Sequence, residues 1–112
     1  MGTLFEKIAA GEIPAEILYR DERCFVIKDI APQAPVHLLI IPLRPLKSLA
    51  EAQDGDGELL GHLLVVVRKM AQNYSPDGNF RLVANSGESA GQSVPHLHLH
   101  LLAGRPFAWP PG

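Results

Sequence analysis

Residues 91–102 read Gly-Gln-Ser-Val-Pro-His-Leu-His-Leu-His-Leu-Leu, and the second half of this stretch alternates polar and apolar residues with a period of two. Such a period is typical of a β-strand that buries one of its faces. In a strand from His96 to Leu102, the three histidines share one face and the leucines between them share the other. We therefore expect the leucines to anchor the strand in the core, while three imidazoles stand in a row on the opposite face.

The sequence before this strand predicts four more strands and two helices. The capping-box pattern of Thr3 and Glu6, followed by Gly11, predicts a short helix over residues 3–10. A longer helix is expected after Asp56, a plausible N-cap, and its buried face is predicted to hold Leu60, Leu63, Leu64, Val67 and Met70. The other strands are expected at residues 17–19, 24–28, 36–41 and 80–84. Five strands joined mostly by short turns, with two inserted helices, favour an antiparallel α+β domain over a doubly wound parallel sheet.

Composition limits the classes of protein to which the chain can belong. With 112 residues, of which 46% are hydrophobic, residues 1–112 are predicted to form a single domain. Ten Lys and Arg against twelve Asp and Glu provide no concentrated basic face for a nucleic-acid polymer or an anionic membrane. Cys24, the only cysteine, lies in an apolar run, so we expect a packed and inert thiol. The start lacks a secretory signal and no apolar run could cross a bilayer, so the expected location is the cytoplasm.

Three histidines in register on one strand indicate a functional site, because each buried imidazole needs hydrogen-bond partners and titrates near neutrality. One chemistry open to them is zinc binding, with His37 as a fourth ligand, although no cysteine or carboxylate stands at a metal-ligand spacing. The other is nucleotidyl transfer, in which a neutral imidazole attacks phosphorus. The turn that holds Gly91 and Ser93 suits the second chemistry, because its backbone and hydroxyl can bind phosphate.

The histidine row resembles the signature of the histidine triad superfamily, and the likeness covers nearly the whole chain. It points to the Hint branch, the histidine triad nucleotide-binding proteins, through residues 5–14, 29–30, 32–35, 37–42, 85 and 91–93 and the Trp-Pro-Pro-Gly tail at 109–112. The resemblance implies a HIT-like fold, a five-stranded antiparallel sheet with two helices, and a homodimer that joins two such sheets. It also implies hydrolysis of purine nucleoside 5′-phosphoramidates, as by an adenosine 5′-monophosphoramidase, to a nucleoside monophosphate and an amine without metal or cofactor.

The resemblance also implies roles for individual residues. His98 would attack the α-phosphorus to give a covalent nucleotidyl-histidine, which water would hydrolyse. His100 and Ser93 would bind phosphate oxygens or assist the leaving group, His96 would orient His98, and His37 would support the site. Among the nucleotide-binding residues, Asp29 would accept the ribose hydroxyls, and Asn85, Gly91 and Gln92 would lie near the phosphate. Trp109 would reach toward the amine portion in the partner subunit's site. The apolar walls around the base would be Phe5, Ile8, Ile13, Ile27 and Ile30.

Two other functions stay open at this point. The same histidines could belong to a nucleotide-binding or zinc-binding interaction module with little turnover. Hydrolysis of dinucleoside polyphosphates is the third hypothesis, although the Trp-Pro-Pro-Gly ending argues against it. The broad apolar face of the long helix fits either a subunit interface or deep burial in its own core.

Overall fold

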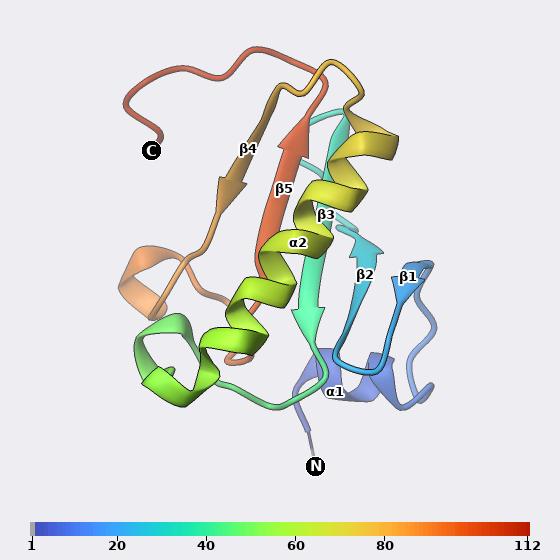
Figure 1. Cartoon of the computed structure of the whole chain (residues 1–112), viewed down its shortest axis with the longest axis vertical. Helices are drawn as coiled ribbons and strands as arrows, with labels where there is room; N and C mark the ends of the chain where they lie inside the picture. The colour runs from blue at the N-terminus through green and yellow to red at the C-terminus, as the bar shows by residue number, and fades with distance from the viewer. Residues whose placement is uncertain (1) are drawn as a thin grey trace.

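The computed structural model describes residues 2–112, in which five antiparallel strands form one sheet with the order β1-β2-β3-β5-β4 (Figure 1). The strands are β1 (Ile17–Arg20), β2 (Cys24–Lys28), β3 (Val36–Pro42), β4 (Phe80–Val83) and β5 (Leu99–Ala103). The helices are α1 (Leu4–Ala9) and α2 (Gly57–Tyr74), with short 3₁₀ turns at Leu49–Glu51, Asp54–Asp56 and Glu88–Ala90. This arrangement confirms the predicted α+β fold with an antiparallel sheet.

Helix α1 begins at the predicted capping box. The Thr3 hydroxyl accepts a hydrogen bond from the Glu6 N–H, and the Glu6 carboxylate accepts one from the Thr3 N–H. The Thr3 N–H bond also lowers the pKa of Glu6. The helix turns Phe5 and Ile8 onto the sheet, where they pack in a cluster with Phe25, Ile27, Leu39 and Ile41. As a result, α1 closes one end of the sheet face that does not face α2.

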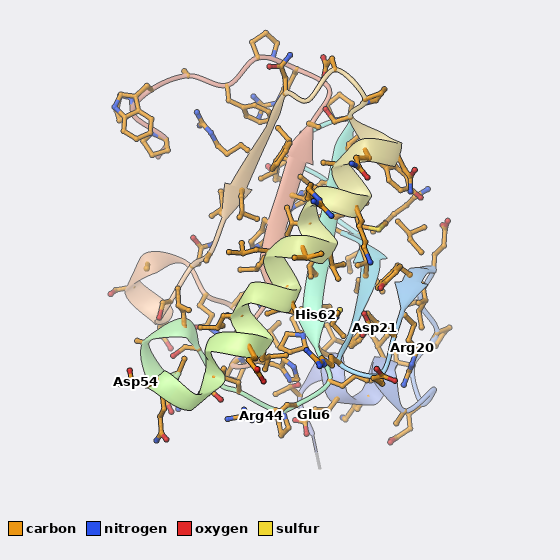
Figure 2. The ribbon with its side chains drawn as sticks, viewed as in Figure 1. Glu6, Arg20, Asp21, Arg44, Asp54 and His62 are labelled. Atoms are coloured by element: carbon orange, nitrogen blue, oxygen red, sulfur yellow. The ribbon has the colours of Figure 1, made fainter. Side chains whose placement is uncertain are left out.

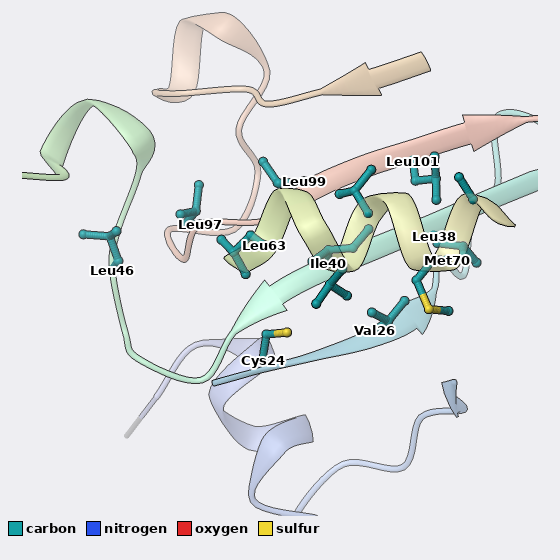
Figure 3. Packing of buried hydrophobic residues seen from close by; sticks show 13 residues of the cluster. Cys24, Val26, Leu38, Ile40, Leu46, Leu63, Met70, Leu97, Leu99 and Leu101 are labelled. Carbon is teal, nitrogen blue, oxygen red and sulfur yellow. The ribbon is translucent and has the colours of Figure 1, made fainter. Parts of the chain in front are cut away.

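Helix α2 covers the other face of the sheet, and Figure 3 shows its side chains meeting those of β2, β3 and β5. Two details of the predicted helix are wrong. Leu64 is 52% exposed and Val66 is fully buried, because Leu64 lies roughly 100° around the helix from Leu63 and outside the stripe that faces the sheet. Asp56 occupies the N-cap position without capping the helix, since its carboxylate accepts the Gln53 N–H and pairs with Arg44.

The strand that carries the triad is shorter than predicted. We expected it to span His96–Leu102, but β5 begins at Leu99, because the preceding segment leaves the ladder with β3 and the Leu97 N–H donates to the Leu46 carbonyl instead. The alternation continues through this segment nevertheless. Leu97, Leu99 and Leu101 all pack in the core under α2 (Figure 3), so the histidines between them are kept on the opposite face.

The turn between β1 and β2 is tied to α2 through Asp21. One carboxylate oxygen of Asp21 accepts the N–H groups of Arg23 and Cys24, and the other accepts from the Tyr19 hydroxyl at 2.8 Å and His62 Nε2 at 2.7 Å. Figure 2 shows His62 of α2 reaching toward this turn. Burial opposes ionisation of Asp21, but these hydrogen bonds outweigh it and hold its pKa well below the usual range. Beside it, Cys24 is buried as predicted, and burial raises the pKa of its thiol to about 12.

Among the helices of residues 2–112, none combines the length and the apolar character that crossing a membrane requires.

Candidate active site

The candidate site lies on the sheet face opposite α2, where β3 and β5 run side by side. Leu39 pairs with His100 and His37 pairs with Leu102 across the two strands. Directly paired residues share a face of the sheet, and so do residues two apart on one strand. His37, Leu39 and His100 therefore project from this face together, next to the segment that carries His96 and His98.

His98 is held in one tautomer. Its Nδ1 lies 2.8 Å from the carbonyl oxygen of His96, and because a carbonyl only accepts, Nδ1 carries the proton and Nε2 keeps its lone pair. The ring packs against the edge of Phe5 at 4.9 Å between centroids and is 6% exposed. Burial lowers the pKa of His98, against the effect of its hydrogen bond to His96. The residue is thus a neutral imidazole with a fixed, unprotonated Nε2.

His96 uses both of its ring nitrogens for structure. Nε2 donates to the Pro42 carbonyl at 2.8 Å, and Nδ1 lies 3.3 Å from the Thr3 hydroxyl. The ring is 1% exposed and meets Phe5 edge-on. With no free nitrogen, His96 fixes the backbone whose carbonyl bonds to His98 Nδ1, and its positioning role in catalysis stays a prediction.

A chain of hydrogen bonds sets the tautomer of His100. The Gln33 N–H donates to His37 Nδ1 at 3.0 Å, so His37 carries its proton on Nε2. That Nε2 lies 2.9 Å from His100 Nδ1 and 3.4 Å from an Asp29 oxygen, and the shorter contact makes His100 Nδ1 the acceptor. Burial, with the neighbouring His98 and His37, lowers the pKa of His100 to about 4. His100 is therefore neutral and carries its proton on Nε2, from which it can donate a hydrogen bond.

A cavity of about 490 Å³ adjoins these histidines, within the range typical of small-molecule sites. Nine of the predicted residues line it: the apolar Phe5, Ile8, Ile13, Ile27 and Ile30, together with Asp29, Ser93, His98 and His100. The cavity is apolar on the side of α1 and polar beside the triad. Asp29 accepts the Ala31 N–H through one oxygen, which leaves its second oxygen with only the long contact to His37.

Several predicted site residues do not line this cavity. The Gln92 side chain holds its own loop, accepting the Gly87 N–H and donating to the carbonyls of Lys47 and Val94. Gly91 has a φ of +101°, a left-handed conformation that favours glycine, and half-buried Asn85 lies beside it. Trp109 is 82% exposed in the C-terminal tail, away from the cavity of its own protomer.

Sequence reasoning missed several residues that build the site, among them Leu39, Val94, Thr3 and Gln33. Leu39 and Val94 line the cavity, and Leu39 could have been found, because it lies two residues beyond His37 on the same strand. Thr3 and Gln33 bond to His96 and His37 through contacts that no local pattern reveals.

Two clusters in residues 2–112 bring potential metal ligands within 4.8 Å of one another: Asp29 with His37 and His100, and Asp21 with Cys24 and His62. In the first cluster, the nitrogens of His37 and His100 that face one another already share a hydrogen bond of 2.9 Å. A metal ion could bind there only if it replaced that bond, and with it the proton that fixes the tautomer of His100.

The chain is similar to known proteins over nearly its whole length. The model of the HIT domain family matches residues 10–107. An uncharacterized HIT-like protein from Synechocystis is 53% identical over 98% of this chain and 96% of its own length. The crystal structure of a HIT family hydrolase from Legionella pneumophila superposes with a TM-score of 0.94 at 46% identity, covering 97% and 98% of the two chains. The crystal structure of a histidine triad nucleotide-binding protein from Candida albicans superposes with a TM-score of 0.81 at 31% identity, covering 96% of this chain and 82% of the other.

Proposed function

This chain belongs to the HIT domain family, and we propose that it acts within the Hint branch as a purine nucleoside 5′-phosphoramidate hydrolase of the adenosine 5′-monophosphoramidase type. The observation that carries the proposal is His98, a neutral imidazole whose Nε2 is left unprotonated by the 2.8 Å bond to the His96 carbonyl. A ring in this state beside a cavity of nucleotide size is equipped to attack phosphorus. The names of the Legionella and Candida proteins, a hydrolase and a nucleotide-binding protein, support the same assignment.

In the first half-reaction, the lone pair of His98 Nε2 forms a bond to the α-phosphorus, and the bond from phosphorus to the leaving nitrogen breaks. The leaving nitrogen keeps the electron pair of that bond and needs one proton to depart as an amine. His100 presents its Nε2 proton beside His98, with 5.0 Å between the ring centroids. The negative charge of a bound phosphate raises the pKa of a neighbouring imidazole, so His100 can take up a second proton from solvent when substrate binds and give its Nε2 proton to the leaving nitrogen.

In the second half-reaction, water attacks the phosphorus of the nucleotidyl-histidine. The water gives one proton to His100, which lost its proton in the first step, and the electron pair of the broken N–P bond returns to His98. The sum is one phosphoramidate and one water converted to a nucleoside monophosphate and an amine. Ser93, which lines the cavity beside both histidines, supplies a hydroxyl to a phosphate oxygen or to the leaving nitrogen.

The nucleoside half of the substrate fits the remaining walls of the cavity. A purine would lie among the apolar side chains of Phe5, Ile8 and Ile27, and Asp29 would accept hydrogen bonds from the ribose hydroxyls. Apolar walls offer few donors or acceptors to the edge of the base, so we expect adenine and guanine nucleotides to be accepted with little distinction.

A homodimer is part of this proposal, and the surface offers a place for it. The edge strand β4 pairs only with β5, and its side chains Phe80 and Leu82 are 38% and 36% exposed. Leu64 and Val65 of α2 are also exposed, at 52% and 42%. An open strand edge flanked by apolar side chains is a ready surface for a second copy of the chain, which would join two sheets into one.

The test is release of amine from adenosine 5′-phosphoramidate by the purified protein, with a chelator present, compared with His98→Ala. We expect the variant to lose at least about 1,000-fold in kcat, because it lacks the nucleophile. Release that stops when the chelator is added would favour a zinc-dependent site. A higher kcat/KM for a dinucleoside polyphosphate would favour the third hypothesis.

A further inference from the structure

Three potential metal ligands converge between the β1–β2 turn and helix α2, on the side of the sheet opposite the triad. Asp21 lies in the turn, Cys24 begins β2, and His62 belongs to the first half of α2. Cys24 Sγ lies 3.7 Å from Asp21 Oδ2, and His62 Nε2 lies 2.7 Å from the same oxygen. Figure 2 shows Asp21 and His62 together, and Figure 3 shows Cys24 on the side of β2 that faces α2. A thiol, an imidazole and a carboxylate therefore surround one point.

The carboxylate of Asp21 is already held in place by its own turn. Its Oδ1 accepts the N–H groups of Arg23 at 2.7 Å and Cys24 at 2.8 Å, and the Tyr19 hydroxyl donates to Oδ2 at 2.8 Å. Outer contacts of this kind fix the orientation of metal ligands in proteins. A carboxylate oxygen can accept two partners, so Oδ2 can keep the bond from Tyr19 and bind a metal in place of the proton of His62.

The distances suit a tetrahedral ion with little movement of the chain. Zinc bonds of about 2.0 Å to oxygen and about 2.3 Å to sulfur place those two atoms roughly 3.5 Å apart, close to the 3.7 Å between Asp21 and Cys24. The same geometry places oxygen and imidazole nitrogen roughly 3.3 Å apart, so His62 would move outward by about 0.6 Å. The side chains of His62 and Asp21 are 23% and 21% exposed, so solvent can supply the ion and a fourth ligand.

This cluster differs from the one that Asp29, His37 and His100 form. A metal at the triad would displace the proton that fixes the tautomer of His100. In contrast, His62 Nδ1 forms no hydrogen bond within residues 2–112, so the proton of the ring can move there when a metal binds Nε2. Of the two clusters, only the one at the turn contains sulfur. Thiolate and imidazole together favour zinc over magnesium and calcium, which take oxygen ligands.

We propose that Asp21, Cys24 and His62 bind a divalent transition metal, zinc above all, with water as the fourth ligand. On binding, the Cys24 thiol releases its proton to solvent and its sulfur bonds to the metal, so that one thiolate and one carboxylate balance the charge of the ion. The ion would tie the β1–β2 turn to α2 and so stabilise the fold. The strand β4, proposed above as the edge for a second copy, is at the opposite edge of the sheet from β1, so a dimer leaves this site open.

The test is titration of the purified, metal-free protein with Co²⁺, a spectroscopic substitute for zinc. Cys24 is the only cysteine of the chain, so a thiolate-to-cobalt charge-transfer band can come only from this site. We expect the band to saturate at one cobalt ion per chain and to disappear when zinc replaces cobalt. Zinc at about a hundredfold excess over its Kd should raise Tm by roughly 10 °C. Removing the metal from folded protein should leave hydrolysis at the triad unchanged, because the two sites lie on opposite faces of the sheet.

Variants of each ligand identify the site. Cys24→Ser should lose the band, and His62→Ala and Asp21→Asn should each weaken cobalt binding by more than about tenfold, since the loss of even an outer partner costs that much. Glu22→Gln, at an exposed carboxylate beside Asp21, is the matched control and should bind cobalt as the wild type does. Thermal unfolding in the presence of a chelator shows whether each variant is folded. His62→Ala changes a partly exposed side chain, so the test stands even if Cys24→Ser does not fold.

Two results would overturn the inference without touching the proposed function. One is the absence of a charge-transfer band in the wild type at millimolar cobalt, or a band whose affinity is unchanged in His62→Ala and Asp21→Asn. The other is metal binding that survives in Cys24→Ser and is lost in His37→Ala, which would place the ion at the triad.

Discussion

Replacing His37 with alanine tests whether hydrogen bonding sets the state of His100. His37 is 6% exposed, and its ring joins the Gln33 N–H at 3.0 Å to His100 Nδ1 at 2.9 Å. The variant leaves both groups without a protein partner, and a buried group without its partner costs about 1–3 kcal/mol. Water can enter the space that the imidazole vacates and bond to both groups. We therefore expect the two groups together, rather than each of them, to cost about 1–3 kcal/mol of unfolding free energy.

The effect on catalysis should exceed any general effect of lower stability. Without His37, His100 is free to carry its proton on either nitrogen and to rotate, so we expect kcat/KM to fall by about 10-fold to 100-fold. His37 is also one of the groups that lower the pKa of His100 to about 4, so its loss should raise that pKa. His37→Gln keeps an N–H donor on a side chain of similar length and should restore part of the activity.

The assay is kcat/KM for adenosine 5′-phosphoramidate from pH 4 to 9, with the tautomer of His100 followed by ¹⁵N NMR. The matched control is His62→Ala, which removes a histidine that bonds to Asp21 far from the triad. Wild-type kcat/KM in His37→Ala, or an equal loss in His62→Ala, would refute the reasoning.

Four further predictions concern pH, stability and assembly. Because burial lowers the pKa of His98, which acts unprotonated, while His100 must bind a proton to serve the leaving amine, kcat/KM should pass through a maximum below about pH 6.5 and fall on both sides of it; a profile that stays flat from about pH 6.5 to 9 would contradict this. The free energy of unfolding should decrease as the pH is lowered from about 6.5 to 4, because His98 and His100 have lowered pKa values and bind fewer protons in the folded than in the unfolded protein. Denaturant titrations should show a weaker dependence on pH for His100→Ala. His62→Ala should cost about 1 kcal/mol by removing a partly exposed bond to Asp21 while leaving kcat unchanged, and thermal unfolding with activity assays checks both. Leu82→Glu on the open edge of β4 should convert a dimer into a monomer in sedimentation, and a wild-type protein that sediments as a 12.2 kDa monomer at micromolar concentration would remove the proposed interface.

The sequence predicted the elements that depend on local patterns. The capping box of Thr3 and Glu6 and the span Cys24–Lys28 were confirmed, because caps and short apolar runs bounded by polar turns need only neighbouring residues. The alternation at residues 96–102 predicted the correct faces, but both bounds of the strand were wrong, since β5 begins at Leu99 and ends at Ala103. Its ladder ends where Leu97 bonds to Leu46, and a residue 51 positions away leaves no trace in a local pattern.

The site was predictable where residues share a strand and less so where distant segments meet. The histidine row itself pointed to a site, and Leu39, which was missed, could have been found from the period of β3. The hydrogen bonds from Thr3 to His96 and from Gln33 to His37 arise only when α1 and the loop before β3 dock on the sheet. Leu64 shows the same limit, because the apolar spacing of α2 is broad and only the packed sheet decides which side chains are covered.

The central claim is that His98 becomes covalently bonded to the nucleotide, and the intact mass of the protein tests it most directly. Protein mixed with adenosine 5′-phosphoramidate and quenched within its first turnovers in denaturing alkali, which preserves phosphorus–histidine bonds, should gain the mass of one nucleotidyl group. Fragmentation should place that group on His98, and His98→Ala should show no gain. A protein that releases amine without any such adduct, or an adduct that persists in His98→Ala, would contradict the account.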